Sequence, residues 1–130
     1  MSDEKVRVAI VGGGRTGAPL IEAFLGTPYV DLVGVADTNP DCAGAALARE
    51  NGIFFTTDAM LFASKGDEID LLFEVSGDLS VKRRLKDAFI QEGNRHTIIV
   101  HDLVARLVTS IVTESDTLVP SMHPDDDGVG

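Results

Sequence analysis

The sequence predicts a doubly wound α/β domain whose parallel sheet has about five strands in the order 3-2-1-4-5. Two observations indicate this fold class: short apolar runs alternate strictly with amphipathic helical segments, and the turns between them are brief. Because crossovers between parallel strands are right-handed, such alternation places helices on both faces of one sheet. The 130 residues, 44% of them hydrophobic, are enough for one such core.

The predicted strands are short apolar runs that end at turn-forming or polar residues. The first of them, 6–11, is almost continuously apolar, which is typical of a strand buried on both faces of a parallel sheet. Gly12 follows it directly, and the fourth strand ends at the pair Ser76-Gly77. We expect the strands at residues 6–11, 30–36, 53–56, 69–75 and 97–100.

The predicted helices lie between these strands and begin at capping residues. Pro19 suits the first turn of the first helix, where a missing N–H does least harm. Asn39 is the expected N-cap of the second helix, with Pro40 as its first residue. Asp58 or the threonine before it, Asp78 and Asp102 are the expected N-caps of the remaining three. We expect the helices at residues 15–25, 40–50, 58–65, 78–92 and 102–114.

The first predicted turn carries the most informative motif, Gly12-x-Gly14-x-x-Gly17, between a strand and a helix. Gly12 allows the tight turn, Gly14 lets a pyrophosphate approach the backbone, and Gly17 lets the helix pack on the strand. The free N–H groups at the helix N-terminus suit phosphate. Asp37 follows at the end of the second strand, where its carboxylate can accept hydrogen bonds from both ribose hydroxyls. The spacing predicts a dinucleotide site.

Asp37 also indicates which dinucleotide is bound. Its charge repels the 2′-phosphate of NADP, and no arginine follows it in residues 38–40, so NAD is favoured. The alternative is that Asp37 only caps a turn. Arg15 is either a cation beside the pyrophosphate, a group that stacks on adenine, or an exposed helix residue. The loop lacks the Gly-Lys-Ser/Thr ending of a P-loop.

Three pieces of the chain resemble the nucleotide-binding half of the Gfo/Idh/MocA oxidoreductases and, more loosely, of homoserine and aspartate dehydrogenases. They are VAIVGGGRTG at 8–17, VGVADTNP at 33–40 and IDLLFEVSG at 69–77. The resemblance implies a Rossmann-type NAD-binding domain in which the last turn, at 75–77, lies beside the nicotinamide-side ribose. The cofactor-binding residues that it implies are Gly12, Gly13, Gly14, Arg15, Thr16, Gly17, Asp37, Thr38, Val75, Ser76 and Gly77.

The resemblance does not extend to the residues that carry out the reaction in that family. The family carries Glu-Lys-Pro after the fifth strand, and its lysine assists proton transfer, but this chain reads Val-His-Asp-Leu at 100–103. The large substrate-binding domain is also absent from these residues. His101, at the carboxyl edge of the sheet, is the catalytic candidate as a proton donor or acceptor; the alternative is a turn histidine. Residues 101–107 also look like Rossmann modules attached to bacterial sensor kinases and regulators.

Composition limits the partners. A net charge of −10 argues against nucleic acid and against an anionic membrane face. No apolar run approaches the ~18 residues of a membrane span, and the polar start, 1–5, does not resemble a signal peptide. The single cysteine, Cys42, indicates a reducing cytoplasm. One cysteine and three scattered histidines give no metal-ligand spacing, and the basic run 82–86 is interpreted as a solvated helix face.

We expect residues 1–115 to form the domain and 116–130, with two prolines and four aspartates, to be a flexible acidic tail or linker. Three functions stay open. The first is an oxidoreductase-like NAD(H)-binding domain that acts as a cofactor sensor or as the nucleotide-binding half of a larger dehydrogenase. The second is a small NAD-dependent dehydrogenase that works as a homodimer through its apolar last helix, with His101 as acid/base. The third is a non-catalytic interaction or regulatory module with a partner in bacterial signalling.

Overall fold

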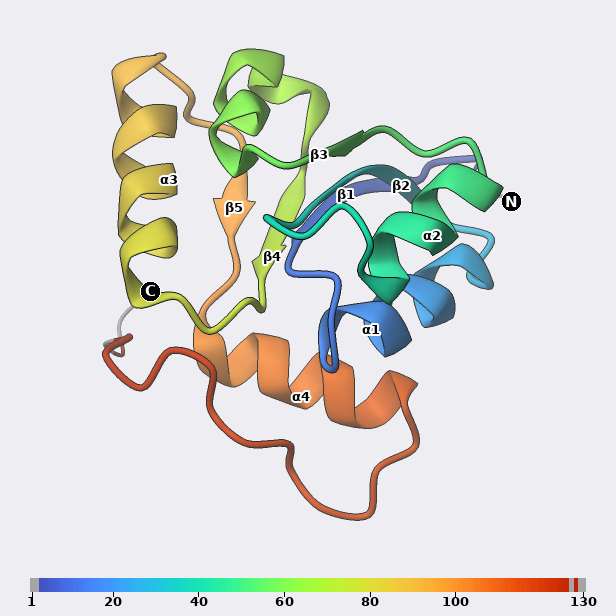
Figure 1. Ribbon diagram of the computed structural model, residues 1–130. Helices are drawn as coiled ribbons and strands as arrows, with labels where there is room; N and C mark the ends of the chain where they lie inside the picture. Colours follow the sequence, from blue (N-terminus) through green and yellow to red (C-terminus); the bar gives the residue numbers. More distant parts are fainter. Residues whose placement is uncertain (1–2, 127, 129–130) are drawn as a thin grey trace.

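The computed structural model describes residues 3–126 and 128, and it contains a five-stranded parallel sheet in the predicted order β3-β2-β1-β4-β5 (Figure 1). The strands are β1 (Val6–Val11), β2 (Val30–Ala36), β3 (Phe55–Thr56), β4 (Leu71–Glu74) and β5 (Ile98–Ile99). The helices are α1 (Gly17–Leu25), α2 (Ala43–Glu50), the 3₁₀ segment η1 (Ala59–Glu68), α3 (Leu79–Gln91) and α4 (Asp102–Val112). The predicted fold class is confirmed.

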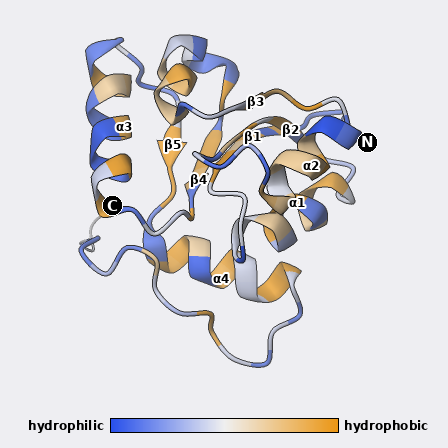
Figure 2. Cartoon of the chain, in the orientation of Figure 1, coloured by the Kyte–Doolittle hydropathy of each residue, from blue (hydrophilic) through white to orange (hydrophobic). Residues whose placement is uncertain are grey.

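Strand β1 lies at the centre of the sheet and is buried on both faces. Val8 and Ile10 belong to a core shared with α1, α2 and α4, whereas Ala9 and Val11 belong to a second core shared with η1 and α3. Successive side chains of a strand point to opposite faces, so one apolar run serves both cores. Figure 2 shows apolar colour along the strands and mixed colour on α3, as this two-sided packing requires.

Helix α2 begins later than the sequence predicts, and the prediction that Asn39 is its N-cap is wrong. Asp37 Oδ1 accepts the N–H of Asn39, and Asn39 Oδ1 accepts the N–H of Asp41, so both side chains hold tight turns instead. The N-cap is Cys42, whose Sγ accepts a backbone N–H from the first turn of α2 at 3.4 Å. The turns that these residues hold also position the end of β2.

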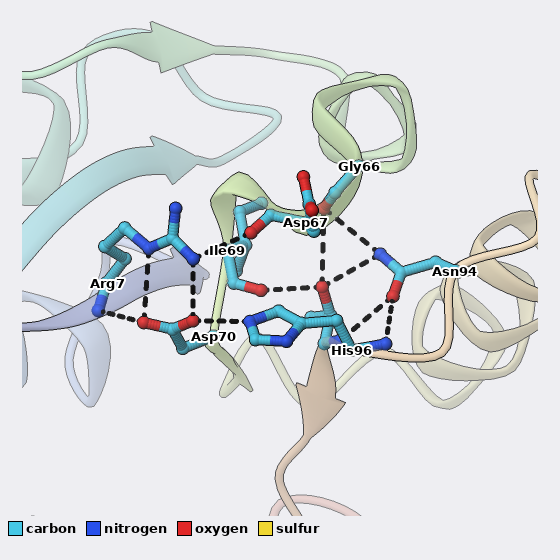
Figure 3. A network of polar contacts seen from close by, with 8 residues as sticks. Arg7, Gly66, Asp67, Ile69, Asp70, Asn94 and His96 are labelled. Carbon is cyan, nitrogen blue, oxygen red and sulfur yellow. Dashed lines mark hydrogen bonds and ion pairs between the residues drawn. The ribbon is translucent and has the colours of Figure 1, made fainter.

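A polar network ties together the amino ends of the strands (Figure 3). Asp70, just before β4, accepts the backbone N–H of Arg7 at 2.8 Å and its Nη2 at 2.9 Å. The same carboxylate lies 2.5 Å from His96 Nε2, in the loop before β5. The hydrogen bonds from Arg7, and then the contact with His96, hold the pKa of Asp70 far below its usual range. The network thus joins three segments at the edge opposite the glycine loop.

We expect Asp70→Asn to lower the free energy of unfolding at pH 7 by about 1 kcal/mol, a value discounted for the partial exposure of the pair. Because the folded pKa of Asp70 is lower than the unfolded value near 3.8, its contribution is complete above that pH and is lost as the pH falls further. Urea unfolding followed by circular dichroism from pH 2.5 to pH 7 measures this difference.

Asp67→Asn is the matched control, because Asp67 contacts Arg7 through its backbone carbonyl rather than through a carboxylate hydrogen bond. We expect the two variants to differ most at pH 7 and the difference to become smaller as the pH falls from 3.8 to 2.5. Identical curves for the wild type and Asp70→Asn would mean that the network adds no stability.

Candidate functional site

A cavity of about 610 Å³ opens outside the carboxyl ends of β1 and β2. Four segments form its walls: the loop before α1, the end of β2, the start of η1, and the turn after β4 with the first half of α3. The lining residues are Val11, Gly12, Gly14, Arg15, Thr16, Ala36, Asp37, Thr38, Thr57, Asp58, Ala59, Met60, Val75, Ser76, Asp78, Val81 and Arg84. The strand order reverses between β1 and β4, and open α/β sheets bind ligands at such a point.

Most of the predicted cofactor residues meet at this cavity. Those that line it are Gly12, Gly14, Arg15, Thr16, Asp37, Thr38, Val75 and Ser76. Gly13, Gly17 and Gly77 do not line it, although the first two belong to the same glycine motif. The structure therefore brings together segments that are far apart in the sequence, as the resemblance implies.

The glycines of the loop differ in what surrounds them. Gly12 has a φ of +107°, and a Cβ there would lie 2.7 Å from the backbone nitrogen of Ser76. At Gly17 a Cβ would lie 1.6 Å from the carbonyl oxygen of Gly12, so the helix can approach the strand only without a side chain. At Gly14 a Cβ would meet no atom within 4 Å. Gly14 also lines the cavity.

Asp37 connects the end of β2 to the glycine loop. Its Oδ2 accepts the N–H of Gly13 at 2.7 Å, and its Oδ1 accepts the N–H of Asn39 at 2.8 Å. A carboxylate has about four acceptor positions, so roughly two remain for other donors. The turn-capping and ligand-binding interpretations of Asp37 are therefore compatible in one side chain.

Two arginines, Arg15 and Arg84, line the cavity from opposite segments. Arg84 was missed by the sequence analysis, which interpreted the basic run of α3 as a solvated face. The signal was present: Asp78, Val81 and Arg84 recur every three residues, which places them on one side of a helix. The cavity thus has one cation on the glycine loop and one on α3, together with three aspartates.

A second group of polar residues lies at the carboxyl ends of β4 and β5, and its members are buried. Lys82 is 3% exposed; its Nζ donates to the carbonyl oxygen of Val100 at 2.9 Å and forms an ion pair with Asp126. His123 is 1% exposed, and its Nε2 contacts the carboxylate of Glu74. The interpretation of Lys82 as a solvated residue is wrong, because the chain after α4 covers it.

Asp102 holds the same stretch of chain from the other side. It accepts the hydroxyl hydrogen of Ser121 at 2.6 Å and the backbone N–H groups of Met122 and His123 at 2.9 Å. Burial would raise the pKa of Asp102, but these hydrogen bonds outweigh it and hold the pKa below its usual range. Residues 119–126, here called the C-terminal segment, are thereby attached to α3 and α4.

The prediction that 116–130 is a flexible tail or linker concerns motion, and it stays a prediction. Positions 127, 129 and 130 lie outside the described residues, among them the last of the three adjacent aspartates. Within the described part, the C-terminal segment makes buried contacts that the composition of the tail does not indicate.

His101 is the N-cap of α4, and the prediction that Asp102 caps this helix is wrong. The ring Nδ1 of His101 accepts the N–H of Leu103 at 3.1 Å, which is the geometry of a turn histidine. His101 is absent from the cavity lining, so its acid/base role stays a prediction. Among the described residues, no group of three or more His, Cys, Asp or Glu side chains could hold a metal ion. None of the helices within them is long and apolar enough to cross a bilayer.

No protein-family model matches the chain. Among curated proteins, the acetaldehyde dehydrogenases of Thermus thermophilus and of a Roseiflexus species are each 30% identical to it, over 84 and 87 residues. These matches cover 64% and 66% of this chain but only 27% and 28% of the two enzymes. The chain therefore spans about a quarter of the length of the curated relatives that it matches.

Solved structures show the same fold in larger oxidoreductases. The scyllo-inositol dehydrogenase of Lactobacillus casei superimposes with a TM-score of 0.57 at 21% identity, over 88% of this chain and 34% of that one. Biliverdin reductase of Synechocystis, solved with biliverdin and NADP⁺, gives a TM-score of 0.54 at 20% identity, over 84% and 34%. The chain therefore has the Rossmann-type fold found in Gfo/Idh/MocA-type oxidoreductases and corresponds to about one third of their length, which confirms the predicted resemblance at the level of the fold.

Proposed function

We propose that the chain is an NAD(H)-binding Rossmann domain of the oxidoreductase type. The observation that carries this proposal is one cavity at the reversal of strand order, lined by both the glycine loop and Asp37. A glycine loop alone is a weak signal, but here it lies between a strand and a helix N-terminus, with a carboxylate at the end of the neighbouring strand.

The residues present fit this cofactor. The open space beside Gly14 would receive the pyrophosphate, next to the N-terminus of α1 and within reach of Arg15. The remaining acceptor positions of Asp37 would take the hydroxyls of the adenosine ribose, and its charge favours NAD over NADP. The bound group would supply hydride chemistry; the chain's own residues hold its phosphates and its sugar.

Two roles are predicted for such a domain, a cofactor sensor and the nucleotide-binding half of a larger dehydrogenase, and the similar proteins favour the second. Those in the curated comparison are dehydrogenases, and the matching solved structures include inositol dehydrogenases, all much longer than this chain. We therefore propose the nucleotide-binding half of a larger dehydrogenase ahead of a free-standing cofactor sensor. Mass spectrometry of the native protein, with the dehydrogenase activity of its complexes, separates these two roles.

Asp37→Ala is expected to weaken NAD⁺ binding roughly 10- to 100-fold in calorimetric titrations. The variant loses charge-assisted hydrogen bonds to the ribose, worth about 1.5–3 kcal/mol. NADP⁺ should lose less affinity than NAD⁺, because the repulsion of its 2′-phosphate disappears as well. Gly14→Val should abolish NAD⁺ binding by filling the open space beside the loop, with the fold retained in circular dichroism.

The control is Asp58→Asn, which removes a second negative charge from the cavity lining but keeps an oxygen that can cap η1. We expect it to leave the affinity for NAD⁺ within about twofold. If the wild type binds neither NAD⁺ nor NADH saturably, the proposal fails. If both Asp37→Ala and Gly14→Val bind like the wild type, the ligand lies elsewhere.

We also propose that the domain has a protein partner and a cytoplasmic location. A homodimer or a signalling-protein partner is supported by four exposed apolar residues on one side of α4: Leu103, Val104, Leu107 and Ile111. A cytoplasmic location is supported by the single cysteine. A small dehydrogenase that uses His101 has less support, because this residue does not line the cavity.

A further inference from the structure

The cavity occupies only one half of the crevice that this sheet order creates. In an order of 3-2-1-4-5, the crevice runs from the carboxyl ends of β2 and β3, across β1, to those of β4 and β5. Asp37 places the adenosine half of a dinucleotide on the β2 side. The cavity extends over that side and ends at the turn after β4 and at α3; within the described part of the chain, no residue after Arg84 lines it.

The C-terminal segment fills the other half. It runs back along α4 to the start of α3, as the red end of the chain in Figure 1 shows. His123 contacts Glu74, the last residue of β4. Asp126 Oδ2 accepts the N–H of Asp102 at 2.8 Å, just beyond β5. The segment therefore crosses the carboxyl ends of both strands between the two helices that flank them.

The contacts that hold this segment are buried and polar, and the one between Lys82 and Asp126 is an ion pair. Glu74, Lys82 and His123 are 2%, 3% and 1% exposed. Lys82 Nζ donates a hydrogen bond to the carbonyl oxygen of Val100 and forms an ion pair with the carboxylate of Asp126. Asp102 accepts hydrogen bonds from two backbone N–H groups of the segment. A ligand that entered this half of the crevice would have to separate buried partners and leave charges without a counterpart, which is strongly unfavourable.

We infer that the site of this domain is matched to an adenosine diphosphate moiety, and that residues 121–126 occupy the place of the nicotinamide ring. This inference rests on the proposed function and makes it more specific. The pyrophosphate and adenosine contacts of NAD⁺ are present in ADP and ADP-ribose as well. The nicotinamide ring of a bound dinucleotide extends into water instead of into the crevice.

The first test is a calorimetric series on the wild-type chain with NAD⁺, ADP-ribose, ADP and AMP. We expect NAD⁺ and ADP-ribose to bind less than fivefold more tightly than ADP. AMP should bind at least tenfold more weakly than ADP, because it lacks the second phosphate at the glycine loop. NAD⁺ binding fivefold or more tighter than ADP would overturn the inference and leave the proposed function standing, whereas no binding by any of the four would remove the proposed function itself.

The second test uses the fluorescence of NADH, which reports the surroundings of the nicotinamide ring directly. Saturating wild-type protein should leave the wavelength and intensity of nicotinamide emission close to their values in buffer. A blue shift with a severalfold rise in intensity would place the ring in a dry pocket and overturn the inference. This measurement does not depend on any variant being stable.

The third test releases the segment with the double variant His123→Gln and Asp126→Asn, and Asp125→Asn serves as the matched control because Asp125 is exposed. In the double variant we expect the ratio of NAD⁺ affinity to ADP affinity to rise at least fivefold, with Asp125→Asn unchanged. A folded double variant with the wild-type ratio would show that the segment does not exclude the nicotinamide half. If the double variant does not fold, the ligand series and the NADH emission still test whether the segment excludes the nicotinamide ring.

Discussion

Gly17→Ala is expected to destabilise the domain by about 3 kcal/mol or more. Inserting atoms into a well-packed region typically costs about 1–3 kcal/mol, and occasionally more. Here the added carbon would lie 1.6 Å from the carbonyl oxygen of Gly12 and 2.5 Å from its carbon, both of which are backbone atoms. Gly12 is itself held by the hydrogen bond of its N–H to Ala36, at 2.7 Å. Neither side of the contact can rotate away, so α1 would have to shift from the end of β1.

The matched control is Gly14→Ala in the same loop, where a Cβ meets no atom within 4 Å. We expect its free energy of unfolding, from urea titration, to stay within about 1 kcal/mol of the wild type. Equal losses in the two variants would mean that the loop is sensitive to any side chain. No loss in Gly17→Ala would mean that α1 and β1 are not packed as closely as described.

Lys82→Met is the second substitution with a large expected effect, a loss of about 3–5 kcal/mol in the free energy of unfolding. Removing one partner of a buried ion pair leaves the other charge without compensation. Without Lys82, the carboxylate of Asp126 loses its ion pair and keeps the hydrogen bond from the N–H of Asp102, and the carbonyl of Val100 loses its Nζ donor. Methionine has nearly the same length, so the loss of charge and of hydrogen bonds dominates the result. Urea unfolding at pH 7 measures it.

Lys86→Met, one turn further along α3, is the control, because this lysine is exposed. Surface substitutions usually change stability by less than about 0.5 kcal/mol. A similar small change in both variants would indicate that Lys82 is solvated in solution, as the sequence alone suggested. A large loss only in Lys82→Met would establish that the C-terminal segment is bound to α3.

The strand order and the glycine loop could be predicted because their signals are local. An apolar run, a turn and a helix N-terminus lie within residues 6–25, and the handedness of crossovers fixes the arrangement of successive units. The lengths of the outer strands could not be predicted as well: β3 and β5 have two residues each, where four were expected. Edge strands have a neighbour on one side only, so apolar sequence alone does not fix how far their pairing extends.

The buried polar residues could not be predicted from local sequence, because their partners are far away in the chain. Lys82 and Asp126 are 44 positions apart. A partial signal was nevertheless present, since Lys82, Leu85 and Phe89 follow the spacing of one helix face and are all buried. The basic run concealed this pattern, because four charged side chains in a short stretch resemble a solvated surface. His123 gave no comparable signal.

The carboxylate of Glu74 links two parts of the molecule that otherwise have separate roles. Its Oε1 accepts the N–H of Ser76, in the turn that borders the cavity, and its other oxygen contacts His123 of the C-terminal segment. Binding equilibria that share such a group are coupled, and the coupling is reciprocal. If a bound nucleotide at the Ser76 turn raises the affinity of the segment for its docking site by some factor, the docked segment raises the affinity for the nucleotide by the same factor. Displacing the segment would then change the affinity for the nucleotide by that same factor.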